Sequence, residues 1–215
     1  MKKLIYISFI SLLFIGCKNQ SGTNSIETEI KITQKIANAH GFENWKNVSE
    51  VSFTFNGKRS WKWNTRTDDI TLITSKDTIF YNRKFIDSLS INADKAFIND
   101  KFWLLVPFQL VWDKGTTISL LSKENAPISK TELNKITLLY SNEVGYTPGD
   151  AYDIYFDNDY LIKEWVFRKG NQNEPTLANT FEKYQDFNGI KIALEHKNAE
   201  GNWNLKFTDV IINLN

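Results

Sequence analysis

Hydrophobic and polar residues alternate in short runs along most of this chain, and turn-forming residues separate the runs. Near the start of the pattern, Val51, Phe53 and Phe55 alternate with polar neighbours and are followed by an Asn-Gly pair. A period of two places every second side chain on one face of a β-strand. The pattern therefore predicts successive short antiparallel strands. Beyond a hairpin over residues 48–63, we expect strands at residues 70–74, 78–81, 116–121, 136–140, 151–156, 160–168, 180–186, 190–196 and 203–214.

The first hairpin predicts a large apolar wall. A two-residue Asn-Gly turn would place Trp61 and Trp63 on the face opposite Phe53. A three-residue connection or a bulge pairs Phe53 with Trp61 and Val51 with Trp63, so that these side chains share one face. Because burial of such a face outweighs a local turn preference, we expect the second register.

Two segments depart from this pattern and predict helices. Over residues 25–40 apolar residues recur at helical spacing, with Gly41 as a C-terminal cap. In the segment 92–110, Asn92 can cap a helix that Pro107 ends or kinks. A curved sheet needs a cover for its apolar concave side. We therefore expect a mainly β (α+β) fold, a curved antiparallel sheet or incomplete β-barrel covered by an N-terminal helix and a central helix.

The N-terminal residues are typical of a bacterial lipoprotein precursor. Two lysines precede an apolar run from Leu4 to Ile15, which matches a secretory signal and is shorter than the roughly 20 residues that a membrane span needs. The run ends in Leu-Phe-Ile-Gly-Cys17, which resembles the lipobox, although that motif prefers Leu where Phe14 stands. We expect a signal peptide over 1–16, a lipidated flexible tether over 17–25, and a single domain over 26–215. A secreted protein with a free Cys17 is the alternative.

Composition excludes several function classes. The chain has 26 Lys and Arg against 25 Asp and Glu, so it lacks the basic surplus that nucleic-acid partners require. Cys17 is the single cysteine. With Cys17 lipidated, the domain has no thiol for a disulfide or a cysteine metal site. We expect no cofactor and no metal.

The titratable residues show no catalytic spacing, so we expect no enzyme. His40 is expected to finish the N-terminal helix, and His196 to lie exposed at a strand end. Asp150 and Asp153 are a candidate carboxylate pair, but a turn at Pro148-Gly149 explains them better. A hydrolase with a site near Asp150 is therefore the less favoured alternative.

The order of elements over residues 26–214 resembles the LolA/LolB-like superfamily of bacterial lipoprotein carriers. Members of that superfamily fold an antiparallel sheet into an incomplete barrel closed by helices. The segments 39–41, 102–108 and 144–150 are also similar to a group of uncharacterised Bacteroidota lipoproteins. The resemblance implies a fold and a carrier activity, but no family motif of known role matches a numbered position here.

The aromatic wall and the apolar part of the central segment are the candidate binding surface. A concave sheet face is wider than one layer of side chains can fill, so these residues line an apolar cavity or else form solid core. For the segment 102–108 the alternatives are a buried plug and a movable lid. The candidate cavity-lining residues are Phe53, Phe55, Trp61, Trp63, Trp103, Leu105 and Phe108.

Taken together, these features predict a lipid-anchored protein of the cell envelope. Its membrane contact would be the lipidated Cys17, and the absence of an acidic run after that residue favours a periplasm-facing position in either membrane by resemblance. We expect a non-enzymatic binding or carrier module for acyl chains, a lipoprotein or another apolar ligand. A protein–protein interaction module without a cavity is the alternative.

Replacement Cys17→Ser is expected to abolish lipid attachment, because the serine hydroxyl does not replace the thiol that accepts the lipid. The measurement is metabolic labelling of the expressed chain with radioactive palmitate. A Ser21→Ala variant in the tether should keep the label. Palmitate incorporation that persists in Cys17→Ser would contradict the lipobox assignment.

Overall fold

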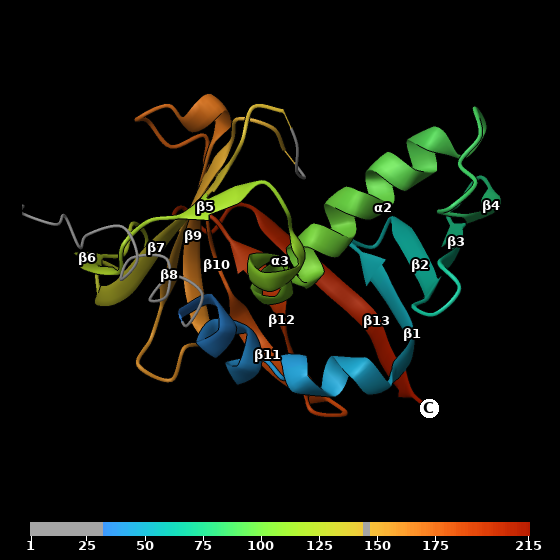
Figure 1. Cartoon of the computed structure of the whole chain (residues 1–215), viewed down its shortest axis with the longest axis horizontal. Helices are drawn as coiled ribbons and strands as arrows, with labels where there is room; N and C mark the ends of the chain where they lie inside the picture. Colours follow the sequence, from blue (N-terminus) through green and yellow to red (C-terminus); the bar gives the residue numbers. More distant parts are fainter. Residues whose placement is uncertain (1–31, 144–146) are drawn as a thin grey trace, which may run out of the picture.

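A computed structural model describes residues 32–143 and 147–215 as two curved antiparallel sheets with helices on their concave side (Figure 1). The predicted signal peptide, Cys17 and the tether lie outside the described residues. The first sheet has the strand order β11 (Glu182–Phe187), β12 (Ile190–Lys197), β13 (Asn204–Leu214), β1 (Val48–Phe55), β2 (Arg59–Asn64), β3 (Asp69–Ile73) and β4 (Thr78–Asn82).

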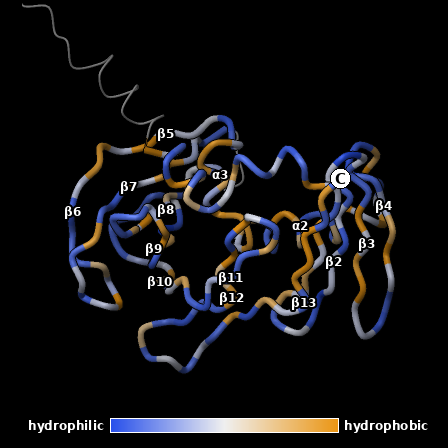
Figure 2. The backbone as a smooth tube through the Cα atoms, turned by 90° about the horizontal axis from the view of Figure 1, so that it is seen from below, coloured by the Kyte–Doolittle hydropathy of each residue, from blue (hydrophilic) through white to orange (hydrophobic). Residues whose placement is uncertain are grey.

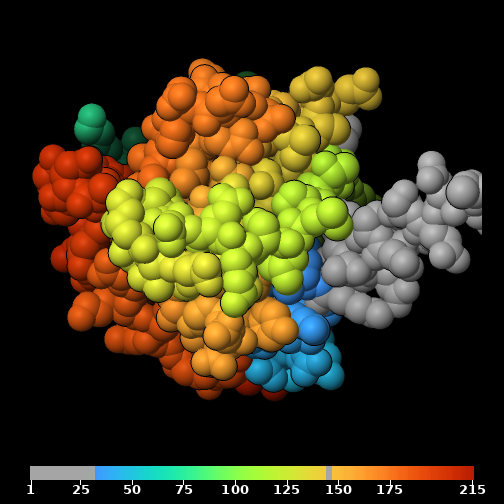
Figure 3. Space-filling view, turned by 90° about the vertical axis from the view of Figure 1, so that its left-hand side faces the viewer, coloured from blue at the N-terminus to red at the C-terminus, as the bar shows by residue number. Residues whose placement is uncertain are grey.

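The second sheet continues the curve of the first. Its order is β10 (Leu177–Thr180), β9 (Ile162–Arg168), β8 (Ala151–Phe156), β7 (Glu132–Tyr140) and β5 (Thr116–Ile118), with β6 (Ser122–Asn125) also paired to β7. The segment around β5 and β6 forms a yellow-green band across the surface when the molecule is seen from that end (Figure 3). Strand β4 is the outer edge of the first sheet and β5 is the outer edge of the second sheet. These two edge strands do not pair with each other, so the described sheets form no closed barrel. The expected fold class is confirmed.

The two sheets meet where the chain passes from β10 into β11. β10 ends at Thr180 and β11 begins at Glu182, so one extended segment contributes to both sheets. The backbone N–H of Lys197 in β12 donates to the Thr180 hydroxyl at 3.0 Å. Residues 180–186 were expected to form one strand, and β6 was not predicted at all. The division at Phe181 arises because β10 pairs with β9 while β11 pairs with β12.

The predicted register of the first hairpin is confirmed. Val51 pairs with Trp63 and Phe53 pairs with Trp61 across β1 and β2. Three residues connect the strands, and Asn56 and Gly57 take φ angles of 51° and 62°. Both residue types tolerate this left-handed conformation. Burial of the shared aromatic face therefore decides the register, as the sequence predicted.

The helical residues 32–39 and two helices of the central segment cover the concave side of the sheets. Residues 32–39 are helical and are followed by the 3-10 helix η1 (Phe42–Asn47), while η2 (Lys169–Asn171) is a short turn beyond β9. The central segment forms α2 (Ile91–Leu104) and α3 (Val106–Trp112), separated at Leu105. Pro107 lies in the first turn of α3, which confirms the predicted kink. No helix in the described ranges is long and apolar enough to cross a membrane.

Gly41 ends the first helical segment in the expected way and also allows a close approach. Its φ angle is +89°, and a Cβ atom there would lie 1.8 Å from the carbonyl oxygen of Gly189. The backbone N–H of Lys191 donates to the His40 carbonyl at 3.0 Å. A side chain at position 41 would therefore separate the end of the helix from the β11–β12 turn.

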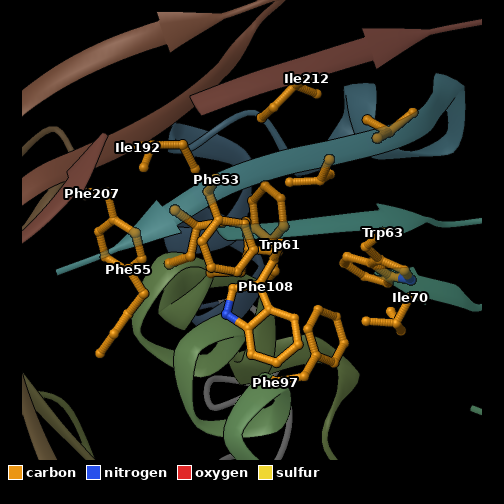
Figure 4. Packing of buried hydrophobic residues seen from close by; sticks show 14 of the residues in the cluster. Phe53, Phe55, Trp61, Trp63, Ile70, Phe97, Phe108, Ile192, Phe207 and Ile212 are labelled. Carbon is orange, nitrogen blue, oxygen red and sulfur yellow. The ribbon is translucent and has the colours of Figure 1, made fainter. Parts of the chain in front are cut away.

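Hydrophobic and hydrophilic residues alternate along the strands (Figure 2), and the buried hydrophobic residues pack against the helices. One buried cluster lies between the first sheet and the two central helices, where rings from β1, β2 and β13 face Phe97 and Phe108 (Figure 4). A second cluster lies between the second sheet and the helices, and includes Ile36, Phe102 and Trp165. Helix α2 contributes to both clusters.

Helix α2 is attached to the first sheet by a buried carboxylate. The side chain of Asp100 is 0% exposed and accepts hydrogen bonds from Arg59 Nε at 2.7 Å and Trp61 Nε1 at 2.8 Å. Near the start of the helix, Asp94 accepts a bond from Arg83 at 2.7 Å. A buried charge that is paired and hydrogen-bonded in this way is costly to disrupt. These two aspartates fix the helix to β2 and to the residue that follows β4.

Replacement Asp100→Asn is expected to lower the free energy of unfolding by about 2–3 kcal/mol, because the neutral amide leaves donors of Arg59 and Trp61 poorly paired. The guanidinium side chain is 32% exposed, so water offsets part of the cost. Urea denaturation is the measurement. The exposed Lys95→Ala on the same helix should change stability by less than about 0.5 kcal/mol. Equal stabilities of the two variants would show that the Asp100 pair does not fasten α2.

Candidate functional site

Most of the predicted cavity residues lie in the packed core. Phe53, Phe55, Trp61, Trp63, Leu105 and Phe108 all belong to the buried cluster under the first sheet. The rings of Trp61 and Trp63 contact Phe97 at centroid distances of 5.4 and 5.6 Å, and Phe53 contacts Phe207 at 5.8 Å (Figure 4). These side chains fill the space between β1, β2 and α2 by contact with one another. Ligand binding by these residues stays a prediction.

Trp103 is placed differently from the other predicted residues. It is partly buried and lines a pocket of about 220 Å³ between α2 and the concave face of the second sheet. We call this the aromatic pocket, and its lining residues are Asn99, Phe102, Trp103, Thr147, Tyr152, Trp165, Phe167 and Leu177. Larger hollows of about 320 and 530 Å³ lie over the outer face of β1 and β2 and along β4. A further hollow of about 310 Å³ lies between the helical residues 32–39 and the strands β7 and β8, and the aromatic pocket is the one that α2 covers.

Ring contacts form the wall of the aromatic pocket. Trp103 meets Trp165 edge to face with ring centroids 4.5 Å apart, and Tyr152 lies 5.1 Å from both Trp165 and Phe167. Offset and edge-to-face pairs at these distances are the favourable arrangements for aromatic rings. The strands therefore supply a rigid apolar wall, and α2 supplies the ring of Trp103 that lies against it.

Sequence analysis did not select the wall residues on β8 and β9. The signal was partial, because Trp165 and Phe167 stand two residues apart as Trp61 and Trp63 do, but the apolar Val166 lies between them. The N–H and C=O pairing of β8 with β9 places Tyr152 opposite Phe167. The sequence thus predicted strands β8 and β9. Only the structure shows that these strands pair and so bring Tyr152 next to Phe167.

His196 is buried, so the prediction that its side chain is exposed at a strand end is wrong. It is 1% exposed and lies within 4.5 Å of Phe181 and 5.4 Å of Trp103, measured between ring centroids. Its Nδ1 lies 3.0 Å from the carbonyl oxygen of Thr180. Polar neighbours at the strand end suggested exposure, but β12 lies between β11 and β13 and turns this side chain to the concave side.

His40 finishes the first helical segment, as the sequence predicted. Its Nδ1 lies 2.8 Å from the Ile36 carbonyl oxygen, and its Nε2 lies 3.2 Å from the hydroxyl of Tyr184. Burial lowers the pKa of His40 to about 4. Burial also raises the pKa of Tyr184 well above its usual value. The pair is therefore neutral and joins the helix end to β11.

The candidate hydrolase residues have separate structural partners. Asp150 accepts the backbone N–H of Gly170 at 2.7 Å. Asp153 pairs with Arg168 at 2.9 Å. Within residues 32–143 and 147–215 there is no group of three or more His, Cys, Asp or Glu side chains that could hold a metal ion. Asp150 and Asp153 thus have different hydrogen-bond partners.

Comparisons with known proteins show a likeness in structure. No protein-family model matches the chain, and a search of curated proteins gives no match. The fold is similar to that of a DUF1329 family protein from Desulfovibrio piger, with 11% sequence identity and a TM-score of 0.46 over 88% of this chain and 93% of that chain. A likeness at this level carries no argument about activity. The resemblance to lipoprotein carriers stays a prediction.

The two histidines are expected to remain neutral well below the usual titration range. Burial lowers the pKa of His196, like that of His40, to about 4, against an ordinary value of 6.5. As the pH falls below 6.5, the unfolded chain binds protons that the folded chain does not, so the free energy of unfolding decreases until about pH 4. In an NMR titration both imidazole signals should keep their chemical shifts from about pH 7.5 to about 5.5. A midpoint near the ordinary value for either histidine would mean that water reaches that ring.

Proposed function

We propose that this protein is a binding or carrier module for an apolar ligand, with an acyl chain as the ligand that the aromatic pocket fits best. The observation that carries the proposal is the position of that pocket. It lies on the concave side of an open curved sheet, with walls formed by aromatic and aliphatic side chains of α2, β8, β9 and β10. An apolar lining with a few polar groups is typical of sites for lipid-like ligands.

The size of the pocket limits what it can hold at one time. Its volume of about 220 Å³ is below the roughly 300–1,000 Å³ of most small-molecule sites. A flexible chain can place its terminal part there while the rest follows the surface. Trp103 lines the pocket, is partly buried and contacts the exposed Trp203 at a centroid distance of 6.2 Å. A rotation of Trp103 would enlarge the space between α2 and the sheet.

The proposal includes attachment to the cell envelope through Cys17. Its support is the sequence of the N-terminal segment, since an apolar run followed by Gly16-Cys17 is typical of a lipoprotein precursor. A diacylated cysteine gives stable anchoring, because two acyl chains bury enough methylene groups. An anchored domain with a pocket for apolar chains would bind its ligand beside the membrane, and the proposed role involves no chemical reaction.

A protein–protein interaction module is the second candidate function. Phe80, Phe85 and Leu89 are 70%, 81% and 82% exposed, and they surround the hollow along β4 at one end of the first sheet. Exposed apolar patches of this kind mark interaction sites more often than isolated surface residues do. The edge strand β4 also presents backbone groups that can pair with another chain. This surface is separate from the aromatic pocket.

The purified chain is expected to bind the methyl ester of a pyrene-labelled fatty acid, a neutral acyl probe, with one site. Replacement Trp103→Ala should weaken binding about tenfold or more, because the ring forms one wall of the pocket and its mouth. Pyrene fluorescence during titration gives the affinity. Urea denaturation should still show one cooperative transition, since Trp103 is only partly buried.

The matched control is a surface variant in which Phe85→Ser and Leu89→Ser remove the exposed patch. It should bind the probe as the wild type does if the aromatic pocket is the site. Loss of binding in this variant with retention in Trp103→Ala would assign the probe to the β4 surface and favour the interaction module. A wild-type chain that binds no probe would exclude the proposed acyl-binding function.

A further inference from the structure

The interior beside the aromatic pocket contains polar atoms without hydrogen-bond partners. Among the residues that the structure describes, Trp165 Nε1, both polar atoms of the Asn179 side chain, and His196 Nε2 are buried and unpaired. The three residues are 1%, 0% and 1% exposed. Each buried unpaired polar atom costs about 1–3 kcal/mol, and folded proteins contain few of them. Several at one place therefore require an explanation.

These atoms lie around one group of rings. Asn179 pairs with Trp165 across β10 and β9, so the two side chains are neighbours on the concave face. The ring of Phe181 lies 5.6 Å from Trp165 and 4.5 Å from His196. Trp103 lies 4.5 Å from Trp165 and 5.4 Å from His196, between ring centroids. Trp165 itself lines the aromatic pocket, and Trp103 contacts both Trp165 and His196, so the unpaired atoms lie next to the pocket wall.

We propose that Trp165, Asn179 and His196 form a polar subsite at the inner end of the aromatic pocket, which binds a neutral hydroxyl group of an amphiphile when the Trp103 ring turns aside. This inference rests on the proposed function, because it names the head group of the ligand whose chain occupies the pocket. The subsite explains why the fold retains unpaired polar side chains next to an apolar space.

The hydrogen-bonding inventory selects the head group. Trp165 Nε1 and Asn179 Nδ2 donate, while Asn179 Oδ1 accepts. The His196 ring has the backbone carbonyls of Thr180 and Ala193 as neighbours, and in the tautomer that donates from Nδ1, Nε2 is an acceptor. A hydroxyl both donates and accepts, so it satisfies atoms of each kind. A carboxylate only accepts, and it would face the lone pairs of Asn179 and His196.

The charges of the three residues agree with this choice. Burial lowers the pKa of His196 to about 4, so the imidazole is neutral at physiological pH. The tryptophan and asparagine side chains do not titrate. An anionic head group would lose its hydration without gaining an ion pair, which is a large cost in an apolar interior. A long-chain alcohol or an acylglycerol keeps its head group neutral and avoids that cost.

The test is displacement of the bound pyrene ester from the purified chain by three ligands of equal chain length: 1-decanol, decanoate and methyl decanoate. We expect 1-decanol to displace the probe at about tenfold lower concentration than the other two, since it alone offers both a donor and an acceptor. Asn179→Leu should remove this preference while binding of the pyrene ester persists. Its unfolding midpoint in urea should be equal to or above that of the wild type, because two unpaired atoms are gone.

The matched control is Gln109→Leu on α3. Gln109 is also buried and its Nε2 also lacks a partner in the described residues, but it does not line the aromatic pocket. This variant should keep the preference for 1-decanol. The inference is overturned if the three ligands compete equally, if Asn179→Leu keeps the preference, or if a crystal structure grown with 1-decanol shows only ordered water on Asn179 and His196. Failure of the pyrene ester itself to bind would instead remove the proposed function, and this subsite with it.

Discussion

The buried Asp100 carboxylate is the interaction on which the arrangement of this fold depends. It accepts bonds from Arg59 and Trp61 of β2 and from the Asn99 amide of its own helix, so α2 has one position across the first sheet. Because α2 is a rigid helix, fixing one side of it also fixes the other. Phe102 and Trp103, within three residues of Asp100, are thereby held against the second sheet. Together with the Asp94–Arg83 pair, this contact fixes α2 between the two cores and beside the aromatic pocket.

The two halves of the curved sheet use aromatic residues differently. Under the first sheet, rings from the β1–β2 hairpin, β13 and α2 pack against each other, and the apolar space is filled. Under the second sheet, the rings of Tyr152, Trp165 and Phe167 stand on the strands, and α2 reaches them with Phe102 and Trp103 at its C-terminal end. The first helical segment and α3 cover other parts of the second sheet, so the gap lies only where the C-terminal end of α2 meets these rings. The pocket therefore follows from where α2 crosses the sheet.

Sequence reasoning succeeded where a local pattern and burial agree. The β1–β2 register followed from the need to bury Trp61 and Trp63 with Phe53, and the kink followed from Pro107. It failed where long-range pairing decides. Nothing in residues 180–186 marks the change from one sheet to the other, because no Gly or Pro stands there. The buried position of His196 has the same cause, since it depends on β12 having a neighbour on each side. Trp103 was selected from the sequence, but its partners on β8 and β9 are set by strand pairing.

Charge is distributed unevenly over the concave interior, and this bears on how a carrier would work. On the first-sheet side, Asp94 and Asp100 are paired with Arg83 and Arg59 and hold α2 in place. On the second-sheet side, the unpaired atoms belong to neutral side chains. A ligand held there by neutral hydrogen bonds and apolar contact leaves at a lower cost than one held by a buried ion pair, whose separation strands a charge. The charged contacts thus hold α2 on the first sheet. The neutral polar groups lie beside the aromatic pocket, where we propose that the ligand binds and leaves. A module that must both take up and release an amphiphile needs this separation.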